Sequence, residues 1–318
     1  MSHVAQMQID DVSAYMHDLG RRARDASRAL AAAHTAAKDA ALDAIADDLD
    51  RVRDELMAEN RKDLEAGAAK GLDAALLDRV TVGVAVIDSG MRSHPDKKPT
   101  ISMAFGYDKK EDKYGHGNHV AGIIAGKPYG PKGGHHGIAP DADLVVVKAF
   151  DADGNGTYAD VIRGIDWVVA NKDAHNIRIL NCSFSSTPRS WYRDDPLAQA
   201  VMGAWQAGIV VVASAGNTGP EPMTIGVPGN VPYIITVGAM SDNYTTDANN
   251  DDRLASFSSV GPTVEGFVKP EVVAPGGHVL GLMGTFTTIA TQHPEFHDGG
   301  AYFTMSGTSQ AASIVSGI

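Results

Sequence analysis

From Val82 onward, the chain alternates between short apolar runs and amphipathic stretches of helical period. The runs VGVAVID, DLVVVKAF, IRILNCSF, GIVVVASAGN and YIITVGAM are rich in β-branched residues, which is typical of strands buried on both faces. Between them, GNHVAGIIAG, TYADVIRGIDWVVANKD and DPLAQAVMGAWQAG predict helices. Such alternation predicts a doubly wound, mostly parallel sheet with right-handed crossovers and helices on both faces. We therefore expect an α/β domain with its functional residues at the carboxyl ends of the strands.

The first 80 residues follow a different pattern. They are rich in Ala, Leu, Asp and Arg and lack β-branched runs. Their apolar residues recur at the three- and four-residue steps of an amphipathic helix, and Thr35 can cap the second such stretch. The sequence predicts an all-helical N-terminal segment over 1–80 and the α/β domain over 81–318. The apolar positions are Tyr15, Leu19, Ala23, Ala26 and Leu30, then Ala41, Ile45, Leu49, Val52 and Leu56.

The composition limits the classes of partner. A formal net charge of -12 at pH 7 disfavours nucleic acid and anionic membrane surfaces, because both would repel the chain. Cys182 is the single cysteine, so no intrachain disulfide can form. The sequence has neither a run of about 18 apolar residues nor the basic and apolar regions of a secretory signal. We expect a soluble, cytoplasmic protein.

Three residues with catalytic chemistry stand beside glycines at the ends of predicted elements. Asp88 follows a buried strand in AVIDSG, His116 lies in GHGNHVAGIIAG, and Ser309 opens a helical run in MSGTSQAAS. Each alone has an ordinary explanation: the aspartate as a turn or cap, the histidine as a structural residue. Together they fit one chemistry, because a serine hydroxyl becomes a nucleophile when a base takes its proton and a carboxylate orients that base. Asn217 in VVASAGNTGP adds a side-chain amide that can stabilise an oxyanion.

Motifs throughout residues 82–318 resemble those of the subtilases, which are serine endopeptidases of subtilisin-like fold. They are AVIDSG, GHGNHVAGIIAG, GIAPDADLVVVKAFDADGNGTYADVIRGIDWVV, VVVASAGNTGP, VGAM, LASFSSVGP, KPEVVAPG and YFTMSGTS. The order of Asp, His and Ser along the chain is also that of subtilisin. The phrase ASFSSVGPTVEGFVKPEVVAPG, with the acidic loop before it, is most similar to the non-secreted bacterial branch. The resemblance implies an endopeptidase that acts on peptides or unfolded proteins.

By this resemblance, Asp88 would orient the imidazole, and His116 would act as general base and then as general acid. Ser309 would attack the peptide carbonyl. Asn217 and the backbone N–H of Ser309 would stabilise the oxyanion. His119 would be the second, structural histidine of the family.

The resemblance also implies a binding site for an extended peptide. Ser183, Phe184 and Ser185 would line the substrate by strand addition, a mode that reads the backbone and implies broad specificity. Ala215 and Gly216 would form the wall of the pocket for P1, the residue before the scissile bond. That pocket would favour a large apolar P1 side chain.

Several positions depart from the subtilase pattern. Ser185 and Ser186 stand where the family usually has glycines, so their side chains would narrow the pocket. Asn118 replaces the preferred threonine, and the serine motif continues as residues 310–314, QAASI, without the family's proline and histidine. Because the chain stops at Ile318 where other subtilases continue, we expect a C-terminally truncated domain. A truncated or fused, non-catalytic scaffold is the alternative to a peptidase.

The N-terminal segment resembles a second family. YMHDLGRRARDASRALA, KDAALDAIADDLD and LMAENRKDLEAGAAKGLDAALLDRVT are similar to the N-terminus of γ-glutamyl phosphate reductase, a member of the aldehyde dehydrogenase superfamily. The similarity covers residues 10–80, and that enzyme's cofactor-binding region and catalytic cysteine lie beyond the matching part. We expect no reductase activity. The helices are a candidate surface for forming a homo-oligomer.

Two acidic segments raise the question of calcium. DADGNG at 151–156 has spaced carboxylates but is too short for an EF-hand loop, and it matches a loop that precedes a helix in subtilases. The other segment is the acidic loop 247–252. The sequence predicts no metal at the catalytic residues and no certain cofactor, and it leaves calcium at these two loops open.

Overall fold

The computed structural model describes residues 82–92, 99–107, 109–127, 136–242 and 251–318, together with Ala40, Ala44, Arg51 and Lys62. Those four isolated positions are helical. The chain divides into two units, Met1–Leu77 and Asp78–Ile318. Apart from the four positions, the helices predicted over 1–80 lie outside the described residues. The following paragraphs concern the second unit.

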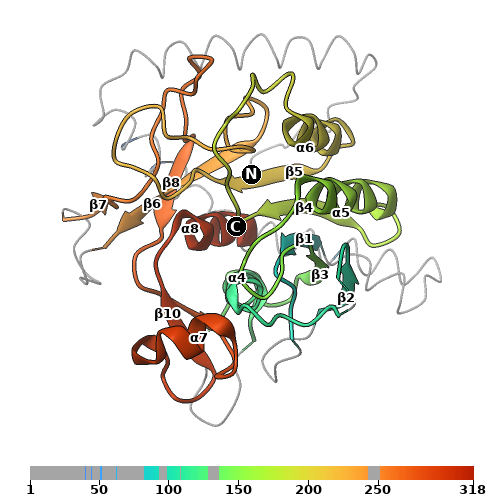
Figure 1. The fold of residues 1–318 in the computed structure, drawn as a ribbon, viewed down its shortest axis with the longest axis vertical. Helices are drawn as coiled ribbons and strands as arrows, with labels where there is room; N and C mark the ends of the chain where they lie inside the picture. Colours follow the sequence, from blue (N-terminus) through green and yellow to red (C-terminus); the bar gives the residue numbers. More distant parts are fainter. Residues whose placement is uncertain are drawn as a thin grey trace. The chain divides into compact units, whose positions relative to one another are not determined.

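An eight-stranded sheet forms the centre of this unit (Figure 1). Its strands are β1 (Gly83–Asp88), β2 (Ile101–Ala104), β3 (Asp143–Lys148), β4 (Ile177–Cys182), β5 (Val210–Ser214), β6 (Ile235–Ser241), β7 (Arg253–Leu254) and β8 (Val272–Pro275). Their order is β2-β3-β1-β4-β5-β6-β7, with β8 also paired to β6. Among these neighbours only β6 and β7 run antiparallel. The predicted α/β class with a mostly parallel sheet is confirmed.

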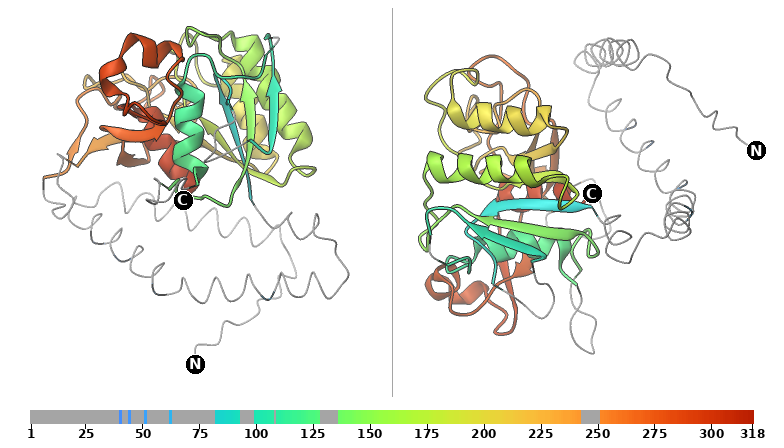
Figure 2. Two further views of the ribbon diagram at one scale, coloured as in Figure 1. Left: turned by 90° about the horizontal axis from the view of Figure 1, so that it is seen from below. Right: turned by 90° about the vertical axis from the view of Figure 1, so that its right-hand side faces the viewer.

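Helices cover both faces of the sheet (Figure 2). The four long helices are α4 (His116–Ala125), α5 (Tyr158–Asn171), α6 (Pro196–Gln206) and α8 (Thr308–Gly317). Helices α5 and α6 pack together over one face, and α4 and α8 pack together over the other. Within the described ranges, no helix has both the length and the apolar character needed to cross a membrane.

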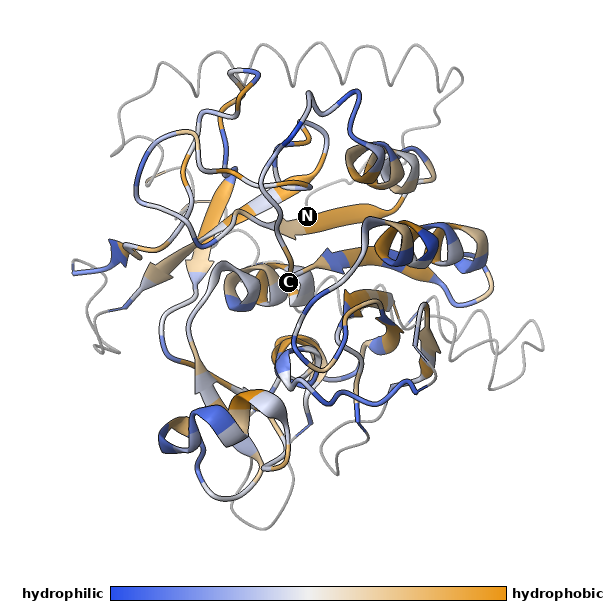
Figure 3. Ribbon diagram, in the orientation of Figure 1, coloured by the Kyte–Doolittle hydropathy of each residue, from blue (hydrophilic) through white to orange (hydrophobic). Residues whose placement is uncertain are grey.

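The position of strand β1 between two layers of helices explains why its sequence is apolar at every position before Asp88. Ala85 and Ile87 point into the core beneath α5 and α6, whereas Val84 and Val86 point into the core beneath α4. Side chains alternate between the two faces of a strand, so a strand covered on both sides has no place for a solvated residue. Strand β5 and most of β4 accordingly carry the orange of hydrophobic residues in Figure 3.

Local signals set where two of the helices begin. The Thr157 side chain accepts the backbone N–H of Asp160 at the start of α5. Asp195 accepts the N–H groups of Leu197 and the residue after it, and a proline occupies the first turn of α6. Both arrangements satisfy backbone donors that a helix start leaves without partners.

Next to the main sheet lies a smaller structure, which the sequence patterns did not predict. Strands β9 (Val279–Leu282) and β10 (Tyr302–Met305) form a separate antiparallel pair. The segment that joins them contains α7 (Thr288–Gln292) and the 3₁₀ helix η2 (Pro294–Phe296), seen at the lower left of Figure 1. These elements have only three to five residues each, too few for a hydrophobic period to identify them.

Two helical glycines provide a test of the packing. A Cβ atom on Gly117, in the first turn of α4, would lie 2.1 Å from the carbonyl oxygen of Gly90, whereas a Cβ on Gly203 in α6 would meet nothing within 4 Å. Gly203→Ala should raise the free energy of unfolding by about 0.5–1 kcal/mol, because alanine is the better helix former. Gly117→Ala should lower it by about 1–3 kcal/mol, because α4 must move away from the loop after β1. Urea unfolding measures both, and a stable Gly117→Ala protein would contradict the close approach.

Candidate active site

Two of the residues predicted to be catalytic, Asp88 and His116, are in direct contact. Asp88 ends β1 and is 3% exposed, and His116 is the first residue of α4. The Nδ1 atom of His116 lies 2.8 and 2.9 Å from the two carboxylate oxygens of Asp88. Because an ionised carboxylate only accepts hydrogen bonds, this contact favours the proton on Nδ1 and leaves Nε2 as the basic nitrogen.

Asp112 holds the turn that presents His116. Its side chain is buried, and its two oxygens accept the backbone N–H groups of Gly115 at 2.7 Å and Asn118 at 2.8 Å. Gly115 adopts a left-handed conformation with φ 109°, which an L side chain rarely allows. A carboxylate at this helix start accepts N–H groups that have no partner within the helix. Its negative charge also interacts favourably with the positive end of the helix dipole. Asp112 was not predicted, because it lies in the charged run KKEDKYG, which resembles a solvated loop.

The loop after β1 is tied to the same helix start. The Ser89 hydroxyl accepts the N–H of Gly117 at 2.9 Å, and the Asn118 side-chain oxygen accepts the N–H of Arg92 at 2.7 Å. Asn118 therefore uses its amide oxygen in the place where the family prefers threonine. The two bonds join β1 and α4, the elements that carry Asp88 and His116.

Lys148, a buried cation beside this site, was not predicted either. It ends β3 directly opposite Asp88 in the strand register, and its ammonium donates to the backbone oxygens of Ser89 and Glu111. Burial lowers the pKa of Lys148, and the negative charges of Asp112 and Asp88 oppose that shift. A lysine within an otherwise apolar run, VVVKAF, was the signal that could have identified it.

The charges around His116 set its basicity. Burial by itself lowers the pKa of His116, but the charge and hydrogen bond of Asp88, with the charge of Asp112, outweigh burial and raise the pKa above its ordinary value. The imidazolium form is therefore stabilised at this position.

His119, the second histidine of the motif, lies in a different setting. Its Nε2 atom lies 2.9 Å from the carbonyl oxygen of Phe303, and its Nδ1 lies 3.4 Å from the Gln310 amide nitrogen. Burial lowers the pKa of His119 to about 4. His119 is therefore neutral near pH 7, donating through Nε2 and accepting at Nδ1, which fits the structural part implied for it.

Ser309 lies in the first turn of α8. Its hydroxyl donates to the backbone oxygen of Ser183 at 3.0 Å, while its own carbonyl oxygen accepts the hydroxyls of Ser183 at 2.9 Å and Ser313 at 2.7 Å. Ser309 lines one cavity of about 470 Å³ together with Asp88 and His116. Within the described part of the chain, the structure has no hydrogen bond between the Ser309 hydroxyl and His116. The three residues are thus gathered at one cavity, with the serine turned toward Ser183.

Asn217 lies at the same cavity, and its amide is oriented by Thr308. The side-chain oxygen of Asn217 accepts both the backbone N–H and the hydroxyl of Thr308, each at 2.9 Å. The amide nitrogen of Asn217 remains as the donor at the other end of the group. Thr308 was not identified from the sequence, although it directly precedes Ser309.

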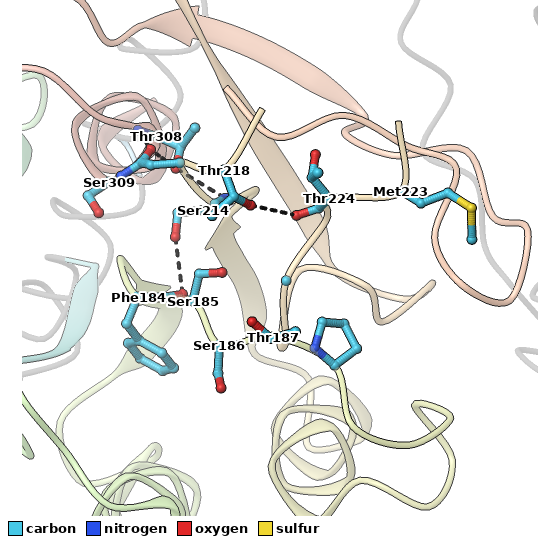
Figure 4. Close-up of a pocket in the computed structure, with 14 residues that line it drawn as sticks. Phe184, Ser185, Ser186, Thr187, Ser214, Thr218, Met223, Thr224, Thr308 and Ser309 are labelled. Carbon is cyan, nitrogen blue, oxygen red and sulfur yellow. Dashed lines mark hydrogen bonds between the residues drawn. The ribbon is translucent and has the colours of Figure 1, made fainter. Parts of the chain in front are cut away.

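A second cavity, of about 460 Å³, adjoins the first and contains most of the predicted substrate-binding residues (Figure 4). Phe184, Ser185 and Gly216 line it, whereas Ser183 lines the first cavity. Ala215 is fully buried behind the wall and lines neither cavity. Phe184, Ser185, Asn217 and Ser309 border both cavities, so the two form one continuous groove.

One of the two loops considered for calcium, 151–156, lies within the described residues. One carboxylate oxygen of Asp151 accepts the backbone N–H groups of Asp153 and Asn155, which shapes the turn before α5. Residues 247–250 lie outside the described residues. In the ranges that are described, no group of three or more His, Cys, Asp and Glu side chains could hold a metal ion. Cys182 is buried, and burial raises the pKa of its thiol.

Comparison with known proteins agrees with this arrangement. The model of the subtilase family matches residues 80–318. The chain is 42% identical over 246 residues to serine protease AprX of Bacillus subtilis (strain 168), covering 74% of this chain and 55% of that protein. It is 35% identical over 237 residues to a thermostable alkaline protease of Halalkalibacterium halodurans, again covering 74% and 55%. The chain thus spans about half the length of these relatives.

A solved structure shows the same likeness in three dimensions. Sphericase superposes with a TM-score of 0.61 at 29% sequence identity, covering 74% of each chain. The family model, the relatives and the fold agree. The chain belongs to the subtilase family.

Proposed function

We propose that this chain is a serine endopeptidase that hydrolyses peptide bonds through Asp88, His116 and Ser309. The observation that carries the proposal is the pairing of Asp88 with Nδ1 of His116, at 2.8 and 2.9 Å, in a cavity that Ser309 and Asn217 also line. Membership of the subtilase family and the names of the relatives, which are proteases, support the same chemistry.

The reaction requires one rotation of the nucleophile. The Ser309 hydroxyl leaves the Ser183 oxygen and turns to Nε2 of His116, which takes its proton as the serine oxygen attacks the peptide carbonyl. The imidazolium that forms is stabilised by the Asp88 carboxylate. His116 then gives the proton to the leaving amine, and a water molecule repeats the sequence on the acyl-enzyme.

Two donors would meet the negative charge on the carbonyl oxygen. One is the Asn217 amide nitrogen, which remains available because Thr308 holds the amide oxygen. The other is the backbone N–H of Ser309, in the first turn of α8, where helical N–H groups lack partners and the dipole favours an anion. Donors fixed before the reaction stabilise the oxyanion without reorganising.

The second cavity would take a large apolar P1 side chain. Two hydroxyls in its wall already have partners: Ser214 donates to the Phe184 oxygen at 3.1 Å, and Thr218 to the Thr224 oxygen at 3.4 Å (Figure 4). Hydroxyls that are already paired leave their cavity better suited to an apolar group. The Ser185 hydroxyl lies 3.1 Å from the place a Cβ on Gly216 would occupy, so it narrows the entrance.

The first test concerns the nucleophile. Ser309→Ala should lower kcat/KM for a peptide p-nitroanilide with a P1 phenylalanine on the order of 10⁴-fold or more, because the triad acts as a unit. Ser190→Ala, a serine outside both cavities, is the matched control and should keep wild-type activity. A wild-type protein that neither hydrolyses the anilide nor reacts with a fluorophosphonate would favour the non-catalytic scaffold instead.

The second test concerns the effect of the Asp112 charge on the pKa of His116. The reaction needs neutral His116, so kcat/KM should rise with pH as the imidazolium loses its proton, and a raised pKa places this rise at higher pH. Asp112→Asn removes a negative charge that favours the imidazolium, so the rise should move to lower pH. Asp173→Asn, at an exposed carboxylate, should leave the profile in place. An unchanged profile in Asp112→Asn would show that Asp112 does not act on the base.

The third test concerns the P1 pocket. Ser185→Gly should widen the entrance and raise the ratio of kcat/KM for phenylalanine over alanine at P1, by a factor on the order of 10. Ser190→Gly again serves as the control, since it makes the same change away from the groove. A ratio that falls or stays constant in Ser185→Gly would contradict the assignment of this cavity to P1.

A further inference from the structure

A third cavity, of about 290 Å³, lies between β10 and the segment that joins β9 to β10. Its apolar lining consists of Ile289 from α7, Phe296 from η2, and Phe303 and Met305 from β10. The ring of Phe296 meets that of Phe303 edge-on, with centroids 6.2 Å apart at 66°. Phe303 is 2% exposed whereas Phe296 is 49% exposed, so one ring forms the base and the other remains open to solvent. The remaining lining residues are His278, His293, Thr304 and Ser306.

This cavity continues the groove that contains the reacting groups. Met305 and Ser306 line both the third cavity and the one that holds His116 and Ser309. The proposed P1 pocket adjoins that central cavity through different residues, Phe184 and Ser185 among them. The three cavities therefore form a series with the catalytic residues in the middle.

The chemistry assigns a direction to this series. With the P1 side chain in the pocket beside Gly216 and the carbonyl oxygen at Asn217, the leaving amine must lie beside His116, which protonates it. The peptide beyond the scissile bond then continues away from the P1 pocket. Met305 and Ser306 border the central cavity and lead into the third one. An extended peptide advances about 3.3 Å per residue, so its first few residues after the bond can reach the third cavity.

The outer wall of the third cavity is fixed to the loop before His116. In α7, the backbone N–H of Thr288 donates to the Lys113 oxygen at 2.9 Å, and that of Ile289 donates to the Tyr114 oxygen at 3.1 Å. The Thr288 hydroxyl also donates to the Ala152 oxygen at 2.8 Å. The cavity is therefore built into the same framework as the catalytic base, and it exists before any ligand binds.

We propose that this cavity binds an apolar side chain of the substrate on the leaving-group side of the scissile bond. The inference rests on the proposed endopeptidase function and extends it from the P1 residue to the sequence that follows. It assigns the segment of α7 and η2 a part in choosing substrates. Peptides with leucine, methionine or phenylalanine at the matching position after the bond are the favoured substrates.

The test compares peptides that differ only after the cleaved bond. Internally quenched peptides share one sequence up to P1 and carry leucine or the similarly sized asparagine at the first, second or third position after it. The p-nitroanilide with the same residues up to P1 has no amino acid there, so each variant's peptide rates are expressed relative to its own anilide rate. The wild type should prefer leucine over asparagine by a factor on the order of 10 at one of the three positions.

Phe296→Ala should reduce that preference to about twofold, because it removes one of the four apolar side chains that line the cavity. Phe286→Ala is the matched control: it lies in the same segment, is 91% exposed and does not line the cavity, so it should keep the preference. Phe296→Asp should turn the preference at the same position from leucine toward lysine. A new preference for lysine cannot arise from a misfolded variant.

Each outcome bears on one of the two proposals in a distinguishable way. If the wild type cleaves the anilide but shows no leucine preference at any position, the subsite is wrong and the peptidase stands. A preference that persists in both Phe296→Ala and Phe296→Asp would also overturn the subsite. If the wild type cleaves neither anilide nor peptides, the proposed function fails and the subsite fails with it.

Discussion

The structure depends on a carboxylate buried at the end of a strand that is otherwise apolar. Asp88 lies where β1 leaves the core, and a charge there is tolerated only with partners at hydrogen-bond distance. His116 from α4 is one partner, and the backbone N–H of Ser89 donates to the same carboxylate at 2.7 Å. Asp112 then fixes the turn that carries the histidine. The need to satisfy one buried charge thus joins the end of β1 to the start of α4.

The sequence predicted the parts of the fold whose hydrophobic pattern is long and two-sided. The strands around Ile87, Val146 and Leu180 and the long helices all lie where the patterns predicted them. Strands β2, β7 and β8 and the α7 region were not predicted, because they are short and mostly partly exposed, so their residues alternate too little to show a period. Such elements are formed by pairing with a sheet that must already exist. The predicted catalytic residues lie at one cavity, whereas Asp112 accepts backbone N–H groups that no sequence motif records.

Two departures from the family pattern acquire definite contacts in this chain. Asn118 accepts a backbone N–H from the loop after β1, and Gln310 approaches His119 with its amide nitrogen. Both side chains are buried, where an unpaired amide would be costly. The histidine stays neutral, so one of its nitrogens remains an acceptor for that amide. Each of these two departures therefore has a hydrogen-bond partner in the structure.

In the proposed reaction, the Ser309 hydroxyl, which donates to the Ser183 oxygen in the structure, would have two states. In one the serine rests on a neutral acceptor, and in the other it faces the imidazole. A turn about a single side-chain torsion is fast, on the order of picoseconds to nanoseconds for an accessible group, so the turn adds no slow step. It does set an equilibrium, and a ligand shifts such an equilibrium only by its different affinity for the two states. A substrate backbone that donated to the Ser183 oxygen would remove that partner, so the proposed function would couple occupancy of the groove to the orientation of the nucleophile.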